Sequence, residues 1–145
     1  MPEKSLDSVF VRNAAHQLAD ACHQAAYQAG WWHDLNTGED QTFDYLVDVL
    51  QAKMKPGRNI PEMLMLVVSE VAEAMEGCRK GLMDDKLPHR TMLEVELADA
   101  VIRIMDLAGG AGLDLPGAIA EKLDYNAKRA DHKPENRRAE GGKAF

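Results

Sequence analysis

The stretch Met63–Met75, MLMLVVSEVAEAM, decides the fold, because its apolar residues recur at the spacing of a helix and not of a strand. Steps of three, four and seven residues return to nearly the same side of a helix, so Glu70 shares its face with Leu66 and Ala74. Glu73 lies one turn later and borders that face. The sequence therefore places a pair of carboxylates on the apolar side of a helix.

A second stretch, Met92–Ile102, MLEVELADAVI, repeats this arrangement. Glu96 lies between Met92 and Ala100 on one face, and Asp99 follows three residues later. Burying one unpaired carboxylate costs several kcal/mol, so inward-facing acidic pairs need protons, cationic partners or a metal ion. Oxygen ligands without His or Cys suit Mg²⁺ or Mn²⁺ better than zinc.

Either acidic pair alone is more simply interpreted as a solvated helix face. The two pairs occur together, however, each on an apolar stripe, in consecutive helices joined by a short loop that makes them antiparallel neighbours. This combination favours a shared metal site over two separate solvated faces.

Capping residues and the apolar periodicity predict four long helices and one short helix, and the two stretches lie in two of the long helices. Asn59 is an N-cap with Pro61 in the first turn, and Thr91 and Glu94 form a capping box. The predicted helices cover about 6–29, 61–80, 91–108 and 114–130, with the shorter helix from 40–42 to 54. Gly109, Gly110 and Gly112 are expected to break the chain, and the segment from Pro134 is expected to be loosely held. The fold class is all-α, with a four-helix bundle core.

Composition narrows the class of protein. A chain of 145 residues with 46% hydrophobic and 28% charged residues predicts one folded domain, residues 1–145, with a polar tail from about 132. A net charge of −7 argues against a partner held by phosphate attraction, such as a nucleic acid polymer. No apolar run is long enough to span a membrane, and the N-terminus has no apolar signal core, so we expect a cytoplasmic protein. Cys22 and Cys78 have no disulfide or zinc spacing and are expected in the core.

Four strings of this sequence resemble the MazG-type all-α nucleoside triphosphate pyrophosphohydrolases, especially short phage-like members. They are SEVAEAMEG (69–77), EVELADAVIRIMD (94–106), KLDYNAKR (122–129) and a basic tail that ends in GGKAF. The resemblance runs from about Gly30 to the C-terminus and is most specific in the E-x-x-E and E-x-x-D pairs. It implies a four-helix core assembled as a homodimer or homotetramer, and Mg²⁺-dependent hydrolysis of (deoxy)nucleoside triphosphates to the monophosphate and pyrophosphate.

The resemblance also implies the ligands of the cation. By position these are Glu70, Glu73, Glu96 and Asp99, around Mg²⁺ or, as a second candidate, Mn²⁺. A triphosphate carries about four negative charges toward these carboxylates, so divalent ions must bridge the two sets. The attacking group is then a metal-bound water, and the sequence assigns no separate general base.

Lys122, Asn126 and Arg129 form a polar stripe that continues an apolar line on the last long helix. The pattern K-x-x-x-N-x-x-R is similar to the substrate-binding helix of the family, and Lys and Arg suit phosphate oxygens. The alternative is an exposed, solvated face.

Three further residues are candidate substrate contacts. Arg103 follows Asp99 by four residues and is expected to pair with a carboxylate or contact phosphate. Trp31 and Trp32 stand together in a loop, and adjacent side chains rarely point the same way. We therefore expect no more than one tryptophan to stack on a base while the other packs inward. The alternative is that both simply pack under the loop.

Two other functions fit the sequence. One is a dUTP- or phosphoribosyl-ATP-specific hydrolase of the same superfamily. The other is a non-catalytic helical oligomerisation module whose carboxylates pair with Arg and Lys across a subunit interface. The enzyme requires a metal ion, whereas the module does not.

Overall fold

The computed structural model describes residues 7–49 and 58–142, and these residues contain helices and no strand. The elements in chain order are α1 (Ser8–Gln28), the π-helical turn η1 (Tyr45–Val49), α2 (Ile60–Lys80), α3 (Met92–Gly110), α4 (Leu115–Lys128), the 3₁₀ turn η2 (Ala130–His132) and α5 (Pro134–Arg138). The all-α class is confirmed. The chain forms two compact units, one spanning Leu18–Leu113 and the other combining residues up to Gln17 with those from Asp114 onward.

Both ends of α2 and the start of α3 follow the capping residues that the sequence predicts. The Asn59 side chain accepts a hydrogen bond from the Glu62 backbone N–H at 3.3 Å. Gly81 ends α2 with φ 64°, a left-handed conformation that glycine adopts without a steric penalty. Thr91 and Glu94 form the predicted capping box, with hydrogen bonds of 3.2 Å and 3.0 Å between side chain and backbone. These caps fix where α2 begins and ends and where α3 begins.

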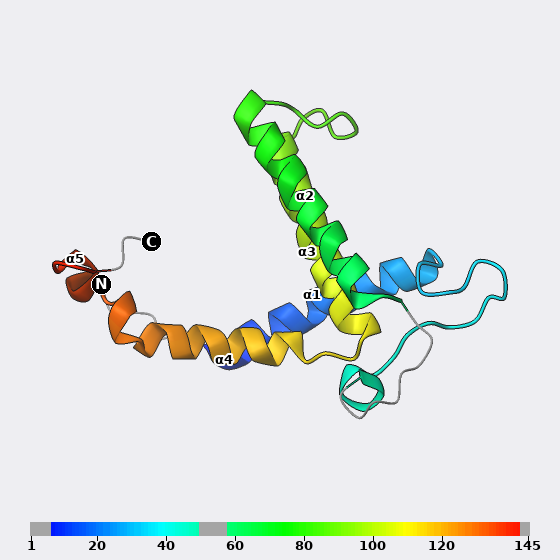
Figure 1. The fold of residues 1–145 in the computed structure, drawn as a ribbon, viewed down its shortest axis with the longest axis horizontal. Helices are drawn as coiled ribbons and strands as arrows, with labels where there is room; N and C mark the ends of the chain where they lie inside the picture. Colours follow the sequence, from blue (N-terminus) through cyan, green and yellow to red (C-terminus); the bar gives the residue numbers. More distant parts are fainter. Residues whose placement is uncertain (1–6, 50–57, 143–145) are drawn as a thin grey trace. The chain divides into compact units, whose positions relative to one another are not determined.

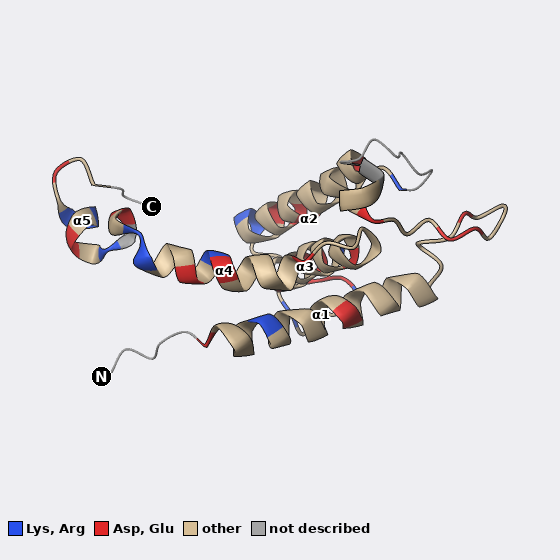
Figure 2. Ribbon diagram, turned by 90° about the horizontal axis from the view of Figure 1, so that it is seen from below, with Lys and Arg blue, Asp and Glu red and all other residues tan. Residues whose placement is uncertain are grey.

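Helices α2 and α3 lie side by side as a hairpin (Figure 1). Gly77 allows the close approach, because a Cβ there would meet the Met92 Cβ at 2.8 Å. The Met92 backbone N–H donates to the Leu82 carbonyl at 3.0 Å, which closes the connecting loop. Acidic residues occur on both helices of the hairpin (Figure 2). The hairpin therefore brings the two acidic pairs onto neighbouring elements.

The core of the larger unit forms around Trp32, which is fully buried against Met63, Leu107 and Ala111. The prediction that Gly109 and Gly110 break the chain is wrong, since α3 continues to Gly110. A side chain at Gly110 would overlap the Trp32 ring, and one at Gly109 would overlap His23. Because Gly109 and Gly110 have no side chains, His23 and Trp32 can pack closely against α3. Gly112, which follows the helix, adopts the left-handed conformation with φ 62°.

The short helix predicted from 40–42 begins later and is of another kind. Helical structure starts at Tyr45 as a single π-helical turn, and the part predicted over 50–54 lies outside the described residues. The Phe43 backbone N–H donates to the Gly110 carbonyl at 2.9 Å, and that of Tyr45 donates to the Ala111 carbonyl at 3.0 Å. These two bonds hold the segment before η1 against the end of α3.

In the smaller unit, α4 begins as predicted and ends two residues early. The Asp114 side chain caps it by accepting from the Gly117 backbone N–H at 3.0 Å. Arg129 adopts extended backbone, which ends α4 at Lys128. Within the predicted tail, α5 forms with Pro134 at its start, and none of its residues is buried.

The hairpin leaves large apolar side chains in contact with solvent, between 36% exposed for Leu93 and 69% for Met75. On α2 these are Leu64, Met65, Val68, Val71 and Met75, and on α3 they are Leu93, Leu97, Val101, Ile102 and Ile104. Of the two cysteines, Cys22 is buried as expected, whereas Cys78 is exposed. Among the helices described, none is both long and apolar enough to cross a bilayer.

Candidate metal centre and adjoining pocket

Three carboxylates converge between α2 and α3. Glu70 comes from α2, and Glu96 and Asp99 come from successive turns of α3. One carboxylate oxygen from each lies within 4.8 Å of the others. Glu70 and Glu96 are each only 8% exposed, and Asp99 is less buried. The predicted convergence of the two acidic pairs is therefore present for these three residues.

Arg103 provides part of the charge compensation. Its Nε donates to Glu70 Oε1 at 2.7 Å, and its side chain is 42% exposed. Within the described part of the chain, no other ion pair reaches the three carboxylates. The cluster therefore holds more negative than positive charge when all its acids are ionised.

The local environment raises the pKa of Glu96 to about 7. Burial has the largest effect, followed by a hydrogen bond with Glu70 and the negative charges of Glu73, Glu70 and Asp99. Below about pH 7, Glu96 therefore holds a proton, which lowers the negative charge of the cluster. A cation that binds here must displace that proton.

Glu73, the fourth predicted ligand, occupies a different position. Its side chain is exposed, and it is not part of the compact group formed by Glu70, Glu96 and Asp99. Its charge nevertheless contributes to the raised pKa of Glu96. Glu73 thus lies at the margin of the cluster, and its role as a ligand stays a prediction.

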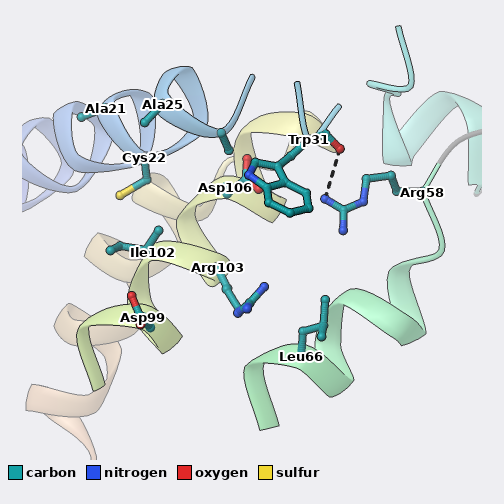
Figure 3. A pocket seen from close by; sticks show the side chains of 11 residues that line it. Ala21, Cys22, Ala25, Trp31, Arg58, Leu66, Asp99, Ile102, Arg103 and Asp106 are labelled. Carbon is teal, nitrogen blue, oxygen red and sulfur yellow. Dashed lines mark hydrogen bonds between the residues drawn. The ribbon is translucent and has the colours of Figure 1, made fainter. Parts of the chain in front are cut away.

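A pocket of about 610 Å³ opens beside Asp99 (Figure 3). Its lining residues are Ala21, Cys22, Ala25, Ala26, Trp31, Arg58, Leu66, Asp99, Ile102, Arg103 and Asp106. Pockets of this volume, mostly apolar with a few polar groups, are typical of small-molecule sites. Because Asp99 and Arg103 belong to both the pocket and the carboxylate cluster, the two features form one continuous site.

The two tryptophans separate as the sequence predicts. Trp32 is fully buried, so it does not present a surface to a ligand. Trp31 is 67% exposed and lines the pocket, between Asp106 and Arg58 in Figure 3. Arg58 donates from Nη1 to the Trp31 carbonyl at 3.4 Å.

Asp106 lies at the end of the pocket away from Asp99 and was not assigned from the sequence. Trp32 donates from Nε1 to Asp106 Oδ1 at 2.6 Å, and His23 Nδ1 lies 2.9 Å from the same oxygen. A signal for this residue exists, because Asp99, Arg103 and Asp106 recur at four and three residues along one face of α3. No sequence signal identifies Arg58 or His23, which come from other segments.

The predicted substrate-binding stripe lies on α4 in the smaller unit. The Lys122 ammonium lies 4.8 Å from the centre of the Tyr125 ring, and Arg129 donates from Nε to Asp131 Oδ1 at 2.9 Å. The Asn126 Oδ1 atom is buried without a hydrogen-bond partner. Two of the three polar groups thus have partners in their own unit, and binding of substrate by the stripe stays a prediction.

No protein-family model, curated protein or solved structure matches this chain.

Proposed function

We propose that this protein is a divalent-cation-dependent nucleoside triphosphate pyrophosphohydrolase. The observation that carries the proposal is the convergence of Glu70, Glu96 and Asp99 between two helices, next to a pocket of small-molecule size. The resemblance of the SEVAEAMEG and EVELADAVIRIMD strings to the MazG-type enzymes supports the same reaction.

The donor set fits a hard cation. All three side chains offer carboxylate oxygen, which Mg²⁺ and Mn²⁺ prefer, and the group contains no His or Cys that would favour zinc. Glu70, Glu96 and Asp99 would hold the ion, with Glu73 as a predicted fourth ligand. When bound, the cation would offset the phosphate charge and make a water more acidic.

The other groups of the site have defined tasks in this reaction. Arg103 is partly exposed to the pocket and can donate to phosphate oxygens while it holds Glu70 in place. In the metal-free protein, Glu96 has a pKa of about 7 and holds a proton that the cation would displace on binding. Glu96 would therefore act as a ligand, and no separate general base is assigned.

The place of the pocket favours cleavage between the α and β phosphates. A nucleoside that occupies the pocket beside Asp99 has its α-phosphate nearest to the carboxylate cluster, because this phosphate is the one attached to the sugar. Water attack at the α-phosphate releases pyrophosphate and leaves the monophosphate. Attack at the terminal phosphate would release orthophosphate instead.

We also propose that the four-helix core forms between two copies of the chain. The α2–α3 hairpin contributes two helices, and its large apolar side chains remain exposed. A second hairpin packed on this surface would bury them and complete a four-helix bundle. The protein would then be a homodimer or a homotetramer, which light scattering coupled to size-exclusion chromatography measures directly.

A panel of ribo- and deoxynucleoside triphosphates with product identification tests the activity. We expect monophosphate and pyrophosphate in Mg²⁺, and no product in excess EDTA. The Asp99→Asn variant should lose activity, whereas Glu76→Gln should keep it, because Glu76 pairs with Arg79 and Lys80 away from the cluster. An unchanged Asp99→Asn activity, or orthophosphate as the product, would contradict the proposal. No response to metal, with loss of the oligomer in Asp99→Asn, would favour the oligomerisation module.

A further inference from the structure

We propose that the pocket is a nucleobase subsite in which Asp106 selects bases that carry an exocyclic amino group, namely adenine, cytosine and guanine, over thymine and uracil. This inference deepens the proposed function and depends on it for the identity of the ligand as a nucleotide. It adds a specificity-determining residue that acts on the base and not on the phosphates.

The carboxylate of Asp106 is fixed in orientation by two ring donors. Trp32 Nε1 and His23 Nδ1 both contact Oδ1, at 2.6 Å and 2.9 Å. A carboxylate only accepts hydrogen bonds, so the His23 nitrogen is the donor in this pair. Asp106 is 8% exposed and is one of the residues that line the pocket.

The second oxygen, Oδ2, is the atom left for a ligand. Both hydrogen bonds that the described residues make to this side chain go to Oδ1. An acceptor in a largely dry pocket loses free energy if a ligand removes its water without offering a donor. Asp106 therefore favours a ligand with an N–H group at this point and disfavours one with a carbonyl oxygen.

The four common base types differ at this point. Adenine and cytosine each present one exocyclic amino group as a donor, whereas thymine and uracil present carbonyl oxygens on either side of a single N–H. Guanine also carries an exocyclic amino group, which can donate to the single oxygen that Trp32 and His23 leave free. A single free acceptor oxygen therefore favours the bases that carry an amino group over thymine and uracil, whose ring N–H lies between two carbonyl oxygens.

The positions of the other lining residues suit a nucleotide in this orientation. Asp99 and Asp106 are seven residues apart on α3, which corresponds to about 10 Å along the helix axis. One end of the pocket thus adjoins the carboxylate cluster for the phosphates, and the other end holds Asp106 for the base. Trp31 provides an exposed aromatic face beside Asp106 on which a base can stack (Figure 3).

A purely structural role for Asp106, as an anchor for Trp32, is the competing interpretation. The Asp106→Asn variant separates the two. Its amide oxygen can still accept from Trp32 and His23, while the amide nitrogen places a donor where Oδ2 was. A structural role changes kcat/KM equally for every base, whereas recognition changes the order of preference.

The decisive experiment measures kcat/KM for dATP, dCTP, dGTP and dTTP with wild type, Asp106→Asn and the matched control Glu76→Gln. Wild type should prefer dATP, dCTP and dGTP over dTTP by about 10- to 100-fold, the range expected for one hydrogen bond to a charged group. Asp106→Asn should lose this preference or reverse it toward dTTP, and Glu76→Gln should match wild type. Equal kcat/KM for all four substrates in wild type, or an equal loss for all four in Asp106→Asn, would overturn the subsite.

A binding measurement without metal or phosphate distinguishes failure of the subsite from failure of the proposed function. Deoxyadenosine, deoxycytidine and thymidine are titrated in EDTA while the fluorescence of Trp31 is followed, with Trp31→Ala as the control that removes the signal. Quenching by the first two nucleosides, but not by thymidine, supports the subsite even if no triphosphate is hydrolysed. Hydrolysis of triphosphates without any such discrimination would leave the proposed function standing and overturn the subsite.

Discussion

The carboxylate cluster of the α2–α3 hairpin and the polar stripe of α4 differ in how far ion pairs compensate their charges. In the cluster, Glu70, Glu96 and Asp99 lie together, and the described residues form a single ion pair with them, from Arg103 to Glu70. On α4 and just beyond it, the charges are compensated over short distances. Lys128 pairs with Asp124 at 2.6 Å, and Arg129 pairs with Asp131.

This difference indicates which region needs a ligand. Lys128 and Arg129 already have carboxylate partners, so a phosphate that binds Arg129 must compete with Asp131. The cluster instead reduces its negative charge by holding a proton on Glu96. A divalent cation would neutralise the excess negative charge of the cluster directly. The largest functional effects should therefore come from substitutions in the cluster.

Removing one ligand of the cluster should have the largest effect. We expect Asp99→Asn to lower kcat/KM for pyrophosphate release by about 100-fold or more, because even groups that only support metal ligands change activity by about 10- to 100-fold. Helical content by circular dichroism should remain at the wild-type level. Activity within a few-fold of wild type in a folded Asp99→Asn protein would remove Asp99 from the metal site.

The affinity for Mg²⁺ should rise with pH. Binding displaces the proton of Glu96, whose pKa is about 7, so the dissociation constant should fall about tenfold between pH 6 and pH 8 and level off above. Without metal, the stability should change in the opposite direction. The folded protein binds more protons than the unfolded chain between the ordinary value of 4.5 and about 7, so the free energy of unfolding should decrease across this range.

Calorimetric titration and thermal melting at several pH values measure these two effects. The Glu96→Gln variant carries no titratable group at this position. Without metal, its melting temperature should therefore not show the decrease with rising pH that Glu96 causes in wild type. A wild-type Mg²⁺ affinity that stays constant from pH 6 to pH 8 would show that Mg²⁺ does not displace the proton of Glu96.

Substituting Arg103 should have a smaller effect, with opposite signs in the two states. Arg103→Gln leaves Glu70 without its ion pair, which should lower the metal-free stability by about 1 kcal/mol, since the arginine is partly exposed. The same change makes the cluster more negative, so added Mg²⁺ should raise the melting temperature more than it does in wild type. An equal response to Mg²⁺ in both proteins would contradict this electrostatic link.

The stripe on α4 should give the smallest change. Arg129→Ala is expected to raise KM for a triphosphate by about three- to tenfold with little change in kcat, because a phosphate contact would replace the existing pair with Asp131. Lys128→Ala, whose side chain pairs with Asp124, serves as the neighbouring control. An unchanged KM in Arg129→Ala would identify the stripe as a solvated face.

The sequence predicts the fold best where a local signal controls it. Asn59, Gly81 and the Thr91 capping box determine both ends of α2 and the start of α3, because each satisfies backbone groups within a few residues. The prediction fails where distant contacts decide. The segment before the turn at Tyr45 binds the end of α3, and Gly110 stays helical because it packs under Trp32.

The same distinction applies to the candidate site. Helical spacing predicts that Glu70, Glu96 and Asp99 face one another, since the periodicity of a helix fixes which residues share a side. It does not predict that Asp106 contacts His23, 83 residues earlier in the chain. The residues that line the base end of the pocket are therefore known only from the packing of α1, the Trp31–Trp32 loop and α3.

Calorimetric titration of Mg²⁺ into the metal-free protein at neutral pH tests the central claim most directly. Performed in two buffers with different heats of ionisation, it reports both metal uptake and the proton released from the cluster. We predict saturable uptake with net proton release in wild type, and loss of both in Asp99→Asn. Absence of Mg²⁺ or Mn²⁺ uptake in wild type, with or without a nucleoside triphosphate present, would contradict the account.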